Sequence, residues 1–167
     1  MKKLISLLTT SFVLFSCSSS KNFKNDDLTK INPLFKAAYR PVNTPVDSSK
    51  GTVQLLRLFR LSDSNVASVS ISFDKNNDLK IRYTNFLGGT SSSTFKGKFK
   101  KNYYEIFLEK NRKSFPLIYS KTAIERIRIG IMKDSTLVVE TYYNHSGSVF
   151  LMAAGSSNKT YATFNKI

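Results

Sequence analysis

The sequence predicts an all-β protein, an antiparallel meander of about eight to ten strands that closes into a barrel, with a β-sandwich as the alternative. Two observations lead to this expectation. From residue 52 onward apolar residues alternate with polar ones, and the connections between the alternating segments are short and rich in turn formers. A hydrophobic content of 41% with 13% aromatic residues is enough for a packed core, and closure is favoured because it removes exposed sheet edges.

The alternation has a period of two, which is typical of a strand with one buried face. Ile127, Ile129 and Ile131 alternate with Arg126 and Arg128, so we expect the isoleucines to point inward and the arginines outward. The same pattern is found at 69–73, 79–83, 95–99 and 137–141, and less regular strands are expected at 52–60, 103–109, 114–119, 148–154 and 160–166.

The connections favour hairpins. They are expected at 74–78, 101–102, 133–135 and 144–147, where Asn, Asp, Ser and Gly tolerate the conformations that tight turns require. Because a parallel crossover needs a dozen or more residues, neighbouring strands must be antiparallel. Gly97, in the middle of an expected strand, marks a bend where the sheet curls.

The first 50 residues differ from the rest. A short basic start, an apolar stretch and a small residue before Cys17 predict a lipoprotein signal peptide at 1–16 and lipidation of Cys17, which is the only cysteine. An ordinary cleaved signal with an incidental cysteine is the alternative. Residues 17–50 are polar and interrupted by prolines, which indicates a lipidated tether in which Pro33–Tyr39 can form one short helix. Residues 51–167 form the expected β-barrel domain.

The anchor and the charge together indicate where the protein works and what it contacts. Palmitate and related acyl chains on Cys17 would hold it in the bacterial cell envelope, on the outer membrane. The chain has 26 basic and 11 acidic residues, which favours an anionic lipid or glycan as ligand. No nucleic-acid-binding signature is present. We expect the ligand to meet a basic stripe of outward-facing residues, namely Lys80, Arg82, Lys96, Lys98, Lys100, Arg126 and Arg128.

Catalytic chemistry is poorly represented in the sequence. His145 is the only histidine and falls in an expected turn, and no serine lies in a nucleophile-elbow pattern. The acids are scattered, and the oxygen-rich segment 74–78 does not have the spacing of a calcium-binding EF-hand loop. We therefore expect no enzyme, no cofactor and no metal site.

The aromatic residues are the remaining signal. They either fill the barrel interior or line a cavity for an apolar ligand. The residues concerned are Tyr83, Phe95, Phe99, Tyr104, Phe107, Phe115, Tyr119, Tyr143 and Phe150.

Three segments, Thr94–Phe99, Ile124–Gly130 and Ala153–Ser157, together with the signal that ends at Cys17, resemble those of small flavobacterial-type lipoproteins with a lipocalin-like β-barrel domain. The resemblance implies an envelope location and a barrel, and it carries no catalytic residue. The expected function is that of a non-enzymatic envelope lipoprotein that binds a lipid, a glycolipid or another amphiphilic or anionic ligand. The alternative is a structural or protein-interaction lipoprotein of the inhibitor or immunity type.

Overall fold

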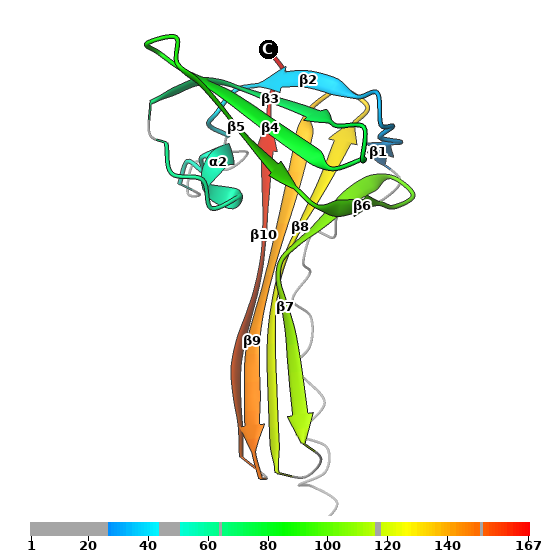
Figure 1. The fold of residues 1–167 in the computed structure, drawn as a ribbon, viewed down its shortest axis with the longest axis vertical. Coiled ribbons are helices and arrows are strands. Elements are labelled where there is room, and N and C mark those ends of the chain that lie inside the picture. The colour runs from blue at the N-terminus through cyan, green and yellow to red at the C-terminus, as the bar shows by residue number, and fades with distance from the viewer. Residues whose placement is uncertain (1–26, 44–50, 64, 116–117, 151) are drawn as a thin grey trace, which may run out of the picture.

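The computed structural model describes residues 27–43, 51–63, 65–115, 118–150 and 152–167 (Figure 1). The expected signal peptide, the lipidation of Cys17 and the beginning of the tether lie outside the described residues. Within the described residues the protein is all-β with antiparallel sheets, which confirms the predicted fold class.

Two sheets share the strands. The longer sheet has the order β10-β9-β8-β7-β6, with β1 paired to one end of β8, and the smaller sheet has the order β2-β3-β4-β5. The elements are β1 (Leu28–Thr29), β2 (Lys36–Tyr39), α2 (Leu55–Leu58), β3 (Val66–Phe73), β4 (Leu79–Asn85), β5 (Thr90–Phe95), β6 (Gly97–Phe99), β7 (Tyr103–Phe115), β8 (Tyr119–Met132), β9 (Leu137–Val149) and β10 (Met152–Phe164).

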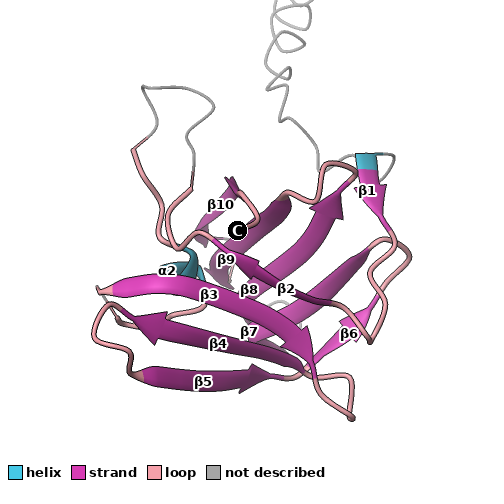
Figure 2. Cartoon of the chain, turned by 90° about the horizontal axis from the view of Figure 1, so that it is seen from above, coloured by secondary structure: helices cyan, strands magenta, loops and turns pink. Residues whose placement is uncertain are grey.

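The expected closed barrel is not found in the described residues. β6 and β10 remain at the margins of the longer sheet, and β2 and β5 at those of the smaller one. The sheets do approach each other at both margins: β5 leads into β6 through Lys96, and an isolated bridge joins Tyr39 to Lys166 (Figure 2). One bridge does not make a ladder, so this part of the molecule consists of two sheets around one core. We call it the head, and its described residues are 27–43, 51–63, 65–108, 126–142 and 159–167.

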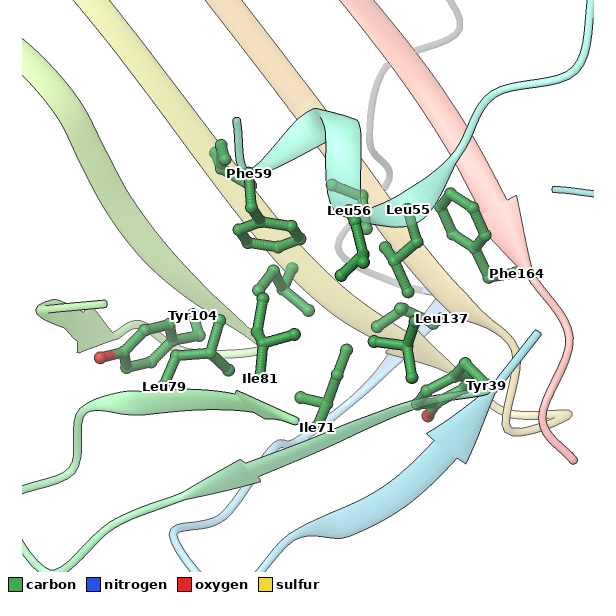
Figure 3. Packing of buried hydrophobic residues seen from close by; sticks show 14 of the residues in the cluster. Tyr39, Leu55, Leu56, Phe59, Ile71, Leu79, Ile81, Tyr104, Leu137 and Phe164 are labelled. Carbon is green, nitrogen blue, oxygen red and sulfur yellow. The ribbon is translucent and has the colours of Figure 1, made fainter. Parts of the chain in front are cut away.

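The core lies in the head, between the two sheets and α2 (Figure 3). Ile127, Ile129 and Ile131 are 1%, 1% and 6% exposed, which confirms their predicted inward direction. The fully buried side chains come from both sheets and from α2, and the largest are Tyr39, Tyr104, Phe59, Phe164, Leu55, Leu56, Ile71, Leu79, Ile81, Ile106, Ile127 and Ile129.

Aromatic rings fill the interior of the head. The ring centroids of Phe73, Phe99 and Tyr104 lie 4.7–4.9 Å apart, and those of Phe59 and Phe95 lie 5.4 Å apart, within the range of favourable aromatic pairs. Tyr104 also donates a hydrogen bond from its hydroxyl to the backbone oxygen of Asn77 at 2.8 Å. Burial raises the pKa of Tyr39 and of Tyr104 to about 12. The interior is therefore filled, but only Tyr83, Phe95, Phe99 and Tyr104 of the nine expected aromatic residues contribute to it, because Phe107, Phe115, Tyr119, Tyr143 and Phe150 are exposed.

Two local predictions are corrected. Lys36–Tyr39, at the end of the expected helix 33–39, is strand β2, because Ala37 and Tyr39 alternate inward and pair with β3. Together with β1 it belongs to the head, so residues 28–39 are not part of a tether. Conversely, the expected strand at 52–60 contains helix α2, in which the adjacent residues Leu55 and Leu56 are both buried, as a helix allows and a half-exposed strand does not.

The predicted connections at 74–78, 101–102 and 133–135 are confirmed as turns of the head. Beyond the head, β7 to β10 continue together as a four-stranded extension, which we call the stalk and whose described residues are 109–115, 118–125, 143–150 and 152–158 (Figure 1). In the stalk the predicted turns and strands are exchanged. Residues 144–147 lie inside β9, with β8 on one side and β10 on the other, whereas the expected strands at 114–119 and 148–154 contain the two hairpin ends.

Candidate functional site

Exposed apolar side chains gather at the end of the stalk. β7 ends at Phe115, opposite Tyr119, and β9 ends at Val149, opposite Met152, so the two hairpins finish at the same level. Exposure ranges from 39% for Tyr119 to 80% for Met152. We call this group the tip, and its members are Phe115, Ile118, Tyr119, Val149, Phe150 and Met152. An exposed cluster of this kind, rimmed by polar residues, is typical of an interaction site.

Phe150 shows that the tip is not explained by folding. Its backbone has φ 51°, in the left-handed region that Gly and Asn adopt easily and bulky residues avoid. Its side chain is 68% exposed and therefore gains little from packing in the fold. A phenylalanine at this position therefore has an unfavourable backbone conformation and little burial to offset it.

Basic residues lie on the stalk strands that lead to the tip. Residues 110–124 contain four cations and no acid, and residues 143–158 contain no charged residue apart from the titratable His145. We call the four cations the collar: Lys110, Arg112, Lys113 and Lys121, all of which are exposed. The end of the stalk therefore combines apolar side chains with an uncompensated positive charge.

A groove of about 800 Å³ runs along the stalk beside the tip. It lies over the distal parts of β8, β9 and β10, and it is lined by the tip residues Tyr119, Val149 and Met152 and by small residues that include Gly147 and Gly155. The small residues leave room on the sheet surface, and the tip residues make one end of the groove apolar.

The structure divides the expected basic stripe among three places. Lys80 and Arg82 lie on the outer face of the smaller sheet, opposite Ser72 and Ser70. Lys96, Lys98 and Lys100 lie in and beside β6, at the margin of the longer sheet. Arg126 and Arg128 lie on β8, on the face of the longer sheet that is turned away from the core.

Arg126 and Arg128 are engaged in ion pairs. Arg128 donates to Glu105 at 2.9 Å and lies 3.5 Å from Glu140, and Arg126 lies 3.5 Å from Glu140. Glu140 is 0% exposed, and its Oε2 atom also forms an ion pair with Nζ of Lys159 at 3.2 Å. The two arginines are therefore not free outward charges, because acids on the neighbouring strands β7 and β9 neutralise them.

Tyrosine rings complete this network. Arg126 lies over the Tyr142 ring at 5.0 Å, Arg128 over Tyr103 at 4.9 Å and Lys159 over Tyr161 at 5.1 Å, all within cation–π range. The hydrogen bond with Tyr161 and the contact with Glu140 raise the pKa of Lys159. These contacts hold the network together and give it a structural role on the outer face of the sheet.

His145 does not lie in a turn. It is part of β9, opposite Ala123 of β8, and its ring stacks on Tyr143 at 4.2 Å between centroids. Its Nε2 atom faces Glu109 of β7 and Glu125 of β8. This cluster lies where the head joins the stalk, and its members come from three different strands, so only the register between those strands brings them together.

The tip was missed as well, although the sequence contains its signal. The apolar runs around Phe115 and Phe150 are short, and each is flanked by small or basic residues that do not alternate with apolar ones. No protein family, curated protein or solved structure matches the chain. In the described part of the chain no helix has the length and hydrophobicity needed to cross a membrane. The function is therefore argued from the geometry of the tip and the stalk.

Proposed function

We propose that this protein is a non-enzymatic envelope lipoprotein, anchored through Cys17, whose stalk inserts its apolar tip into a lipid surface that carries anionic headgroups. The observation that carries the proposal is Phe150, an exposed aromatic residue in a backbone conformation that disfavours it. Aromatic and aliphatic side chains at the end of a projecting element are suited to the boundary between lipid headgroups and acyl chains.

The charges of the stalk support an anionic surface. Each basic residue near such a surface contributes about 1 kcal/mol, so Arg112, Lys113 and Lys121, the collar residues nearest the tip, contribute about 3 kcal/mol at moderate salt, whereas Lys110 pairs with Ile124 close to the head. Insertion of the tip adds to this, because full burial of one large apolar side chain is worth about 1.5–3 kcal/mol. The two contributions are complementary, since the cations lie just behind the apolar residues.

The dimensions of the stalk suit this role. From Glu125, at the junction with the head, to Tyr119 at the tip there are six residue steps, which span about 20 Å at ~3.3 Å per residue. Interfacial side chains enter a membrane by about 5–10 Å. The head would thus remain clear of the surface that the tip enters.

The proposal is also consistent with the packed interior of the head, where aromatic rings occupy the space that a ligand would need. The expectation of an amphiphilic ligand inside a barrel requires an interior cavity, whereas the head interior is occupied by the rings of Phe73, Phe99 and Tyr104. The head also exposes Leu34, Val42, Phe86, Leu87, Phe107 and Ile167, but these come from separate parts of the chain, whereas the six tip residues lie together at the ends of two paired hairpins. A lipid ligand is therefore better placed at the end of the stalk than between the sheets.

The test uses the expected mature chain, residues 17–167 with Cys17→Ser, so that neither an acyl group nor the apolar signal segment contributes, and sedimentation with vesicles of phosphatidylglycerol and phosphatidylcholine or of phosphatidylcholine alone. We expect binding to the anionic vesicles that weakens as salt rises. Phe150→Asn combined with Met152→Asn should reduce it at least tenfold. Asn suits the positive φ of position 150, so this variant keeps the hairpin.

Leu87→Asn is the matched control, because Leu87 is 94% exposed in a turn of the head and its replacement should leave vesicle binding unchanged. A second arm replaces Lys96, Lys98 and Lys100 with Gln and tests the head residues of the basic stripe. If the tip variant binds as well as the parent while the triple variant does not, the contact surface is the head and the proposal is wrong. Binding of neither kind of vesicle would refute it too, and would favour a protein partner for the tip.

A further inference from the structure

Three metal-ligating side chains meet where the head joins the stalk. Glu109, Glu125 and His145 come from β7, β8 and β9, which are adjacent strands of the longer sheet. Glu109 pairs with Glu125, Glu125 pairs with Tyr143, and His145 is two residues further along β9, so all three side chains project from the same face. The irregularity in β7 between Phe107 and Glu109 sets this register for Glu109.

Their ligand atoms converge. Nε2 of His145 lies 3.5 Å from Oε2 of Glu109 and 3.9 Å from Oε1 of Glu125, and one ligand atom from each residue lies within 4.8 Å of the other two. Nε2 is shielded from solvent and has no hydrogen-bond partner among the described residues. Two carboxylates and an imidazole nitrogen thus point at one place without a hydrogen bond between them.

Such an arrangement requires a hydrogen or a cation between the three groups. A neutral imidazole with its lone pair on Nε2 would face two carboxylates, and three acceptors held together repel one another. The Arg60 guanidinium donates to Oε2 of Glu125, on the side away from His145, and does not bridge the three groups. The centre is therefore suited either to a metal ion or to a proton on Nε2.

The distances favour the metal. Bonds of about 2.0–2.2 Å to imidazole and carboxylate in a tetrahedral site separate neighbouring ligand atoms by roughly 3.3–3.6 Å. The 3.5 Å separation between His145 and Glu109 falls in this range and is longer than the 2.7–3.2 Å typical of an N–H···O hydrogen bond, and the 3.9 Å separation between His145 and Glu125 exceeds the range by about 0.3 Å, which a small side-chain movement on binding would close. We propose that Glu109, Glu125 and His145 bind a divalent transition-metal ion of the zinc type, with a fourth position open to water.

Neighbouring side chains orient the ligands. Tyr143 stacks on the His145 ring with an interplanar angle of 23°, which fixes the direction of Nε2. Arg60 holds one oxygen of Glu125 and leaves the other toward His145. Support of this kind around metal ligands tunes both their geometry and their affinity. The Glu125 side chain is 15% exposed and those of Glu109 and His145 are 38% exposed, so an ion can enter from solvent.

The site would act on the link between head and stalk. It joins three strands at the level where the core ends, and residue 60, which follows α2, contacts one of the ligands. A bound ion would hold these strands in one register and stiffen the junction without taking part in the contact that the tip makes.

The experiment uses the full chain without an affinity tag and with Cys17→Ser, which removes the thiol as a competing ligand. Zinc chloride is titrated in a non-coordinating buffer, followed by calorimetry and by the imidazole resonances in a ¹H–¹⁵N NMR spectrum. Because the chain has one histidine, those resonances report on His145 alone. We expect one ion per chain, a shift or broadening of the imidazole signals, and an intense visible spectrum of tetrahedral type with Co²⁺.

Glu109→Gln and His145→Ala should each weaken zinc affinity at least tenfold. Both side chains are part-exposed on the stalk, so these variants should still fold. Asp134→Asn is the matched control, since it removes an exposed acid in the β8–β9 turn and should leave zinc affinity unchanged. Imidazole signals that do not respond to zinc would overturn the proposal and leave an Nε2–H group of His145 facing the two glutamates. Zinc binding that is equal in all variants would overturn it as well.

Discussion

Replacing Glu140 with Gln should lower the free energy of unfolding by about 2–3 kcal/mol. Glu140 is 0% exposed and lies 3.5 Å from Arg126, 3.5 Å from Arg128 and 3.2 Å from Lys159. Glutamine keeps the volume of the side chain, so no cavity forms. The change removes one negative charge from among three positive ones.

The expected loss of unfolding free energy depends on the hydration and the ion pairs that the three cations keep after the substitution. Breaking a buried ion pair costs about 3–5 kcal/mol when the remaining charge stays buried and unpaired. Here the side chains of Arg126, Arg128 and Lys159 are 21%, 24% and 32% exposed, and Arg128 keeps Glu105 at 2.9 Å. Partial hydration and this second acid reduce the loss below that range.

Urea unfolding followed by circular dichroism measures the change, and the dependence on urea should stay the same because the exposed surface does not change. Lys159→Gln and the double variant complete a double-mutant cycle, with an expected coupling of about 1 kcal/mol. If Glu140→Gln unfolds within 0.5 kcal/mol of the parent and shows no coupling to Lys159, the network does not stabilise the fold and our reasoning about its burial is wrong.

Four further predictions concern the head. Ile129→Asp should unfold it, since Ile129 is 1% exposed and an unpaired charge would be buried; circular dichroism that keeps the parent spectrum would show a wrong strand assignment. Tyr39→Phe should leave the free energy of unfolding unchanged or raise it, because the buried hydroxyl has no hydrogen-bond partner among the described residues. Tyr104→Phe should lower it by about 1 kcal/mol, because the hydrogen bond to Asn77 is lost. Urea unfolding measures both. The pKa of Tyr39 and Tyr104 rises from 10.0 to about 12 on folding, so the unfolded chain loses these protons first as the pH increases. The free energy of unfolding should therefore be intact below pH 10 and decline between about pH 10 and 12, less steeply in Tyr104→Phe. A urea midpoint that does not change with pH would contradict this. Gly97→Ala should destabilise the head by about 1–3 kcal/mol, since the added Cβ would lie 2.5 Å from the backbone oxygen of Glu105 and from the Tyr104 ring, while Gly51→Ala, with open space around it, should not change the melting temperature.

The strands of the head were predictable because one face of each is buried. The alternation around Ile71 and Ile129 records that burial directly, and the turns at 74–78 and 133–135 follow from their composition. Helix α2 was not predictable in the same way, because a short apolar run such as Leu55-Leu56 has no period that distinguishes a helical turn from a buried strand.

The strands and turns of the stalk could not be predicted from the conformational preferences of its residues. Its strands contain turn formers, as at 144–147, because pairing with a strand on each side fixes β9 whatever its residues prefer. Its hairpin ends contain apolar residues, because their role does not come from packing. The ion pairs of Arg126 and Arg128 were missed for another reason. They depend on the register between strands, and the sequence does not specify which acid lies opposite which arginine.

The uniform ladder of the stalk makes its length an adjustable dimension. Between Lys110 and Phe115 each residue of β7 pairs in unbroken order with β8, and from Glu125 toward the tip no described residue of these strands belongs to the core cluster of the head, although Ala123 and Ile124 are buried within the stalk. Removing two residues from each of the four strands would shorten the stalk by about 6–7 Å and return every side chain to its own face. Removing one from each would exchange the faces, so the length of the stalk can change only in steps of two residues per strand. Related chains could therefore differ in the distance between head and tip without any change in the head.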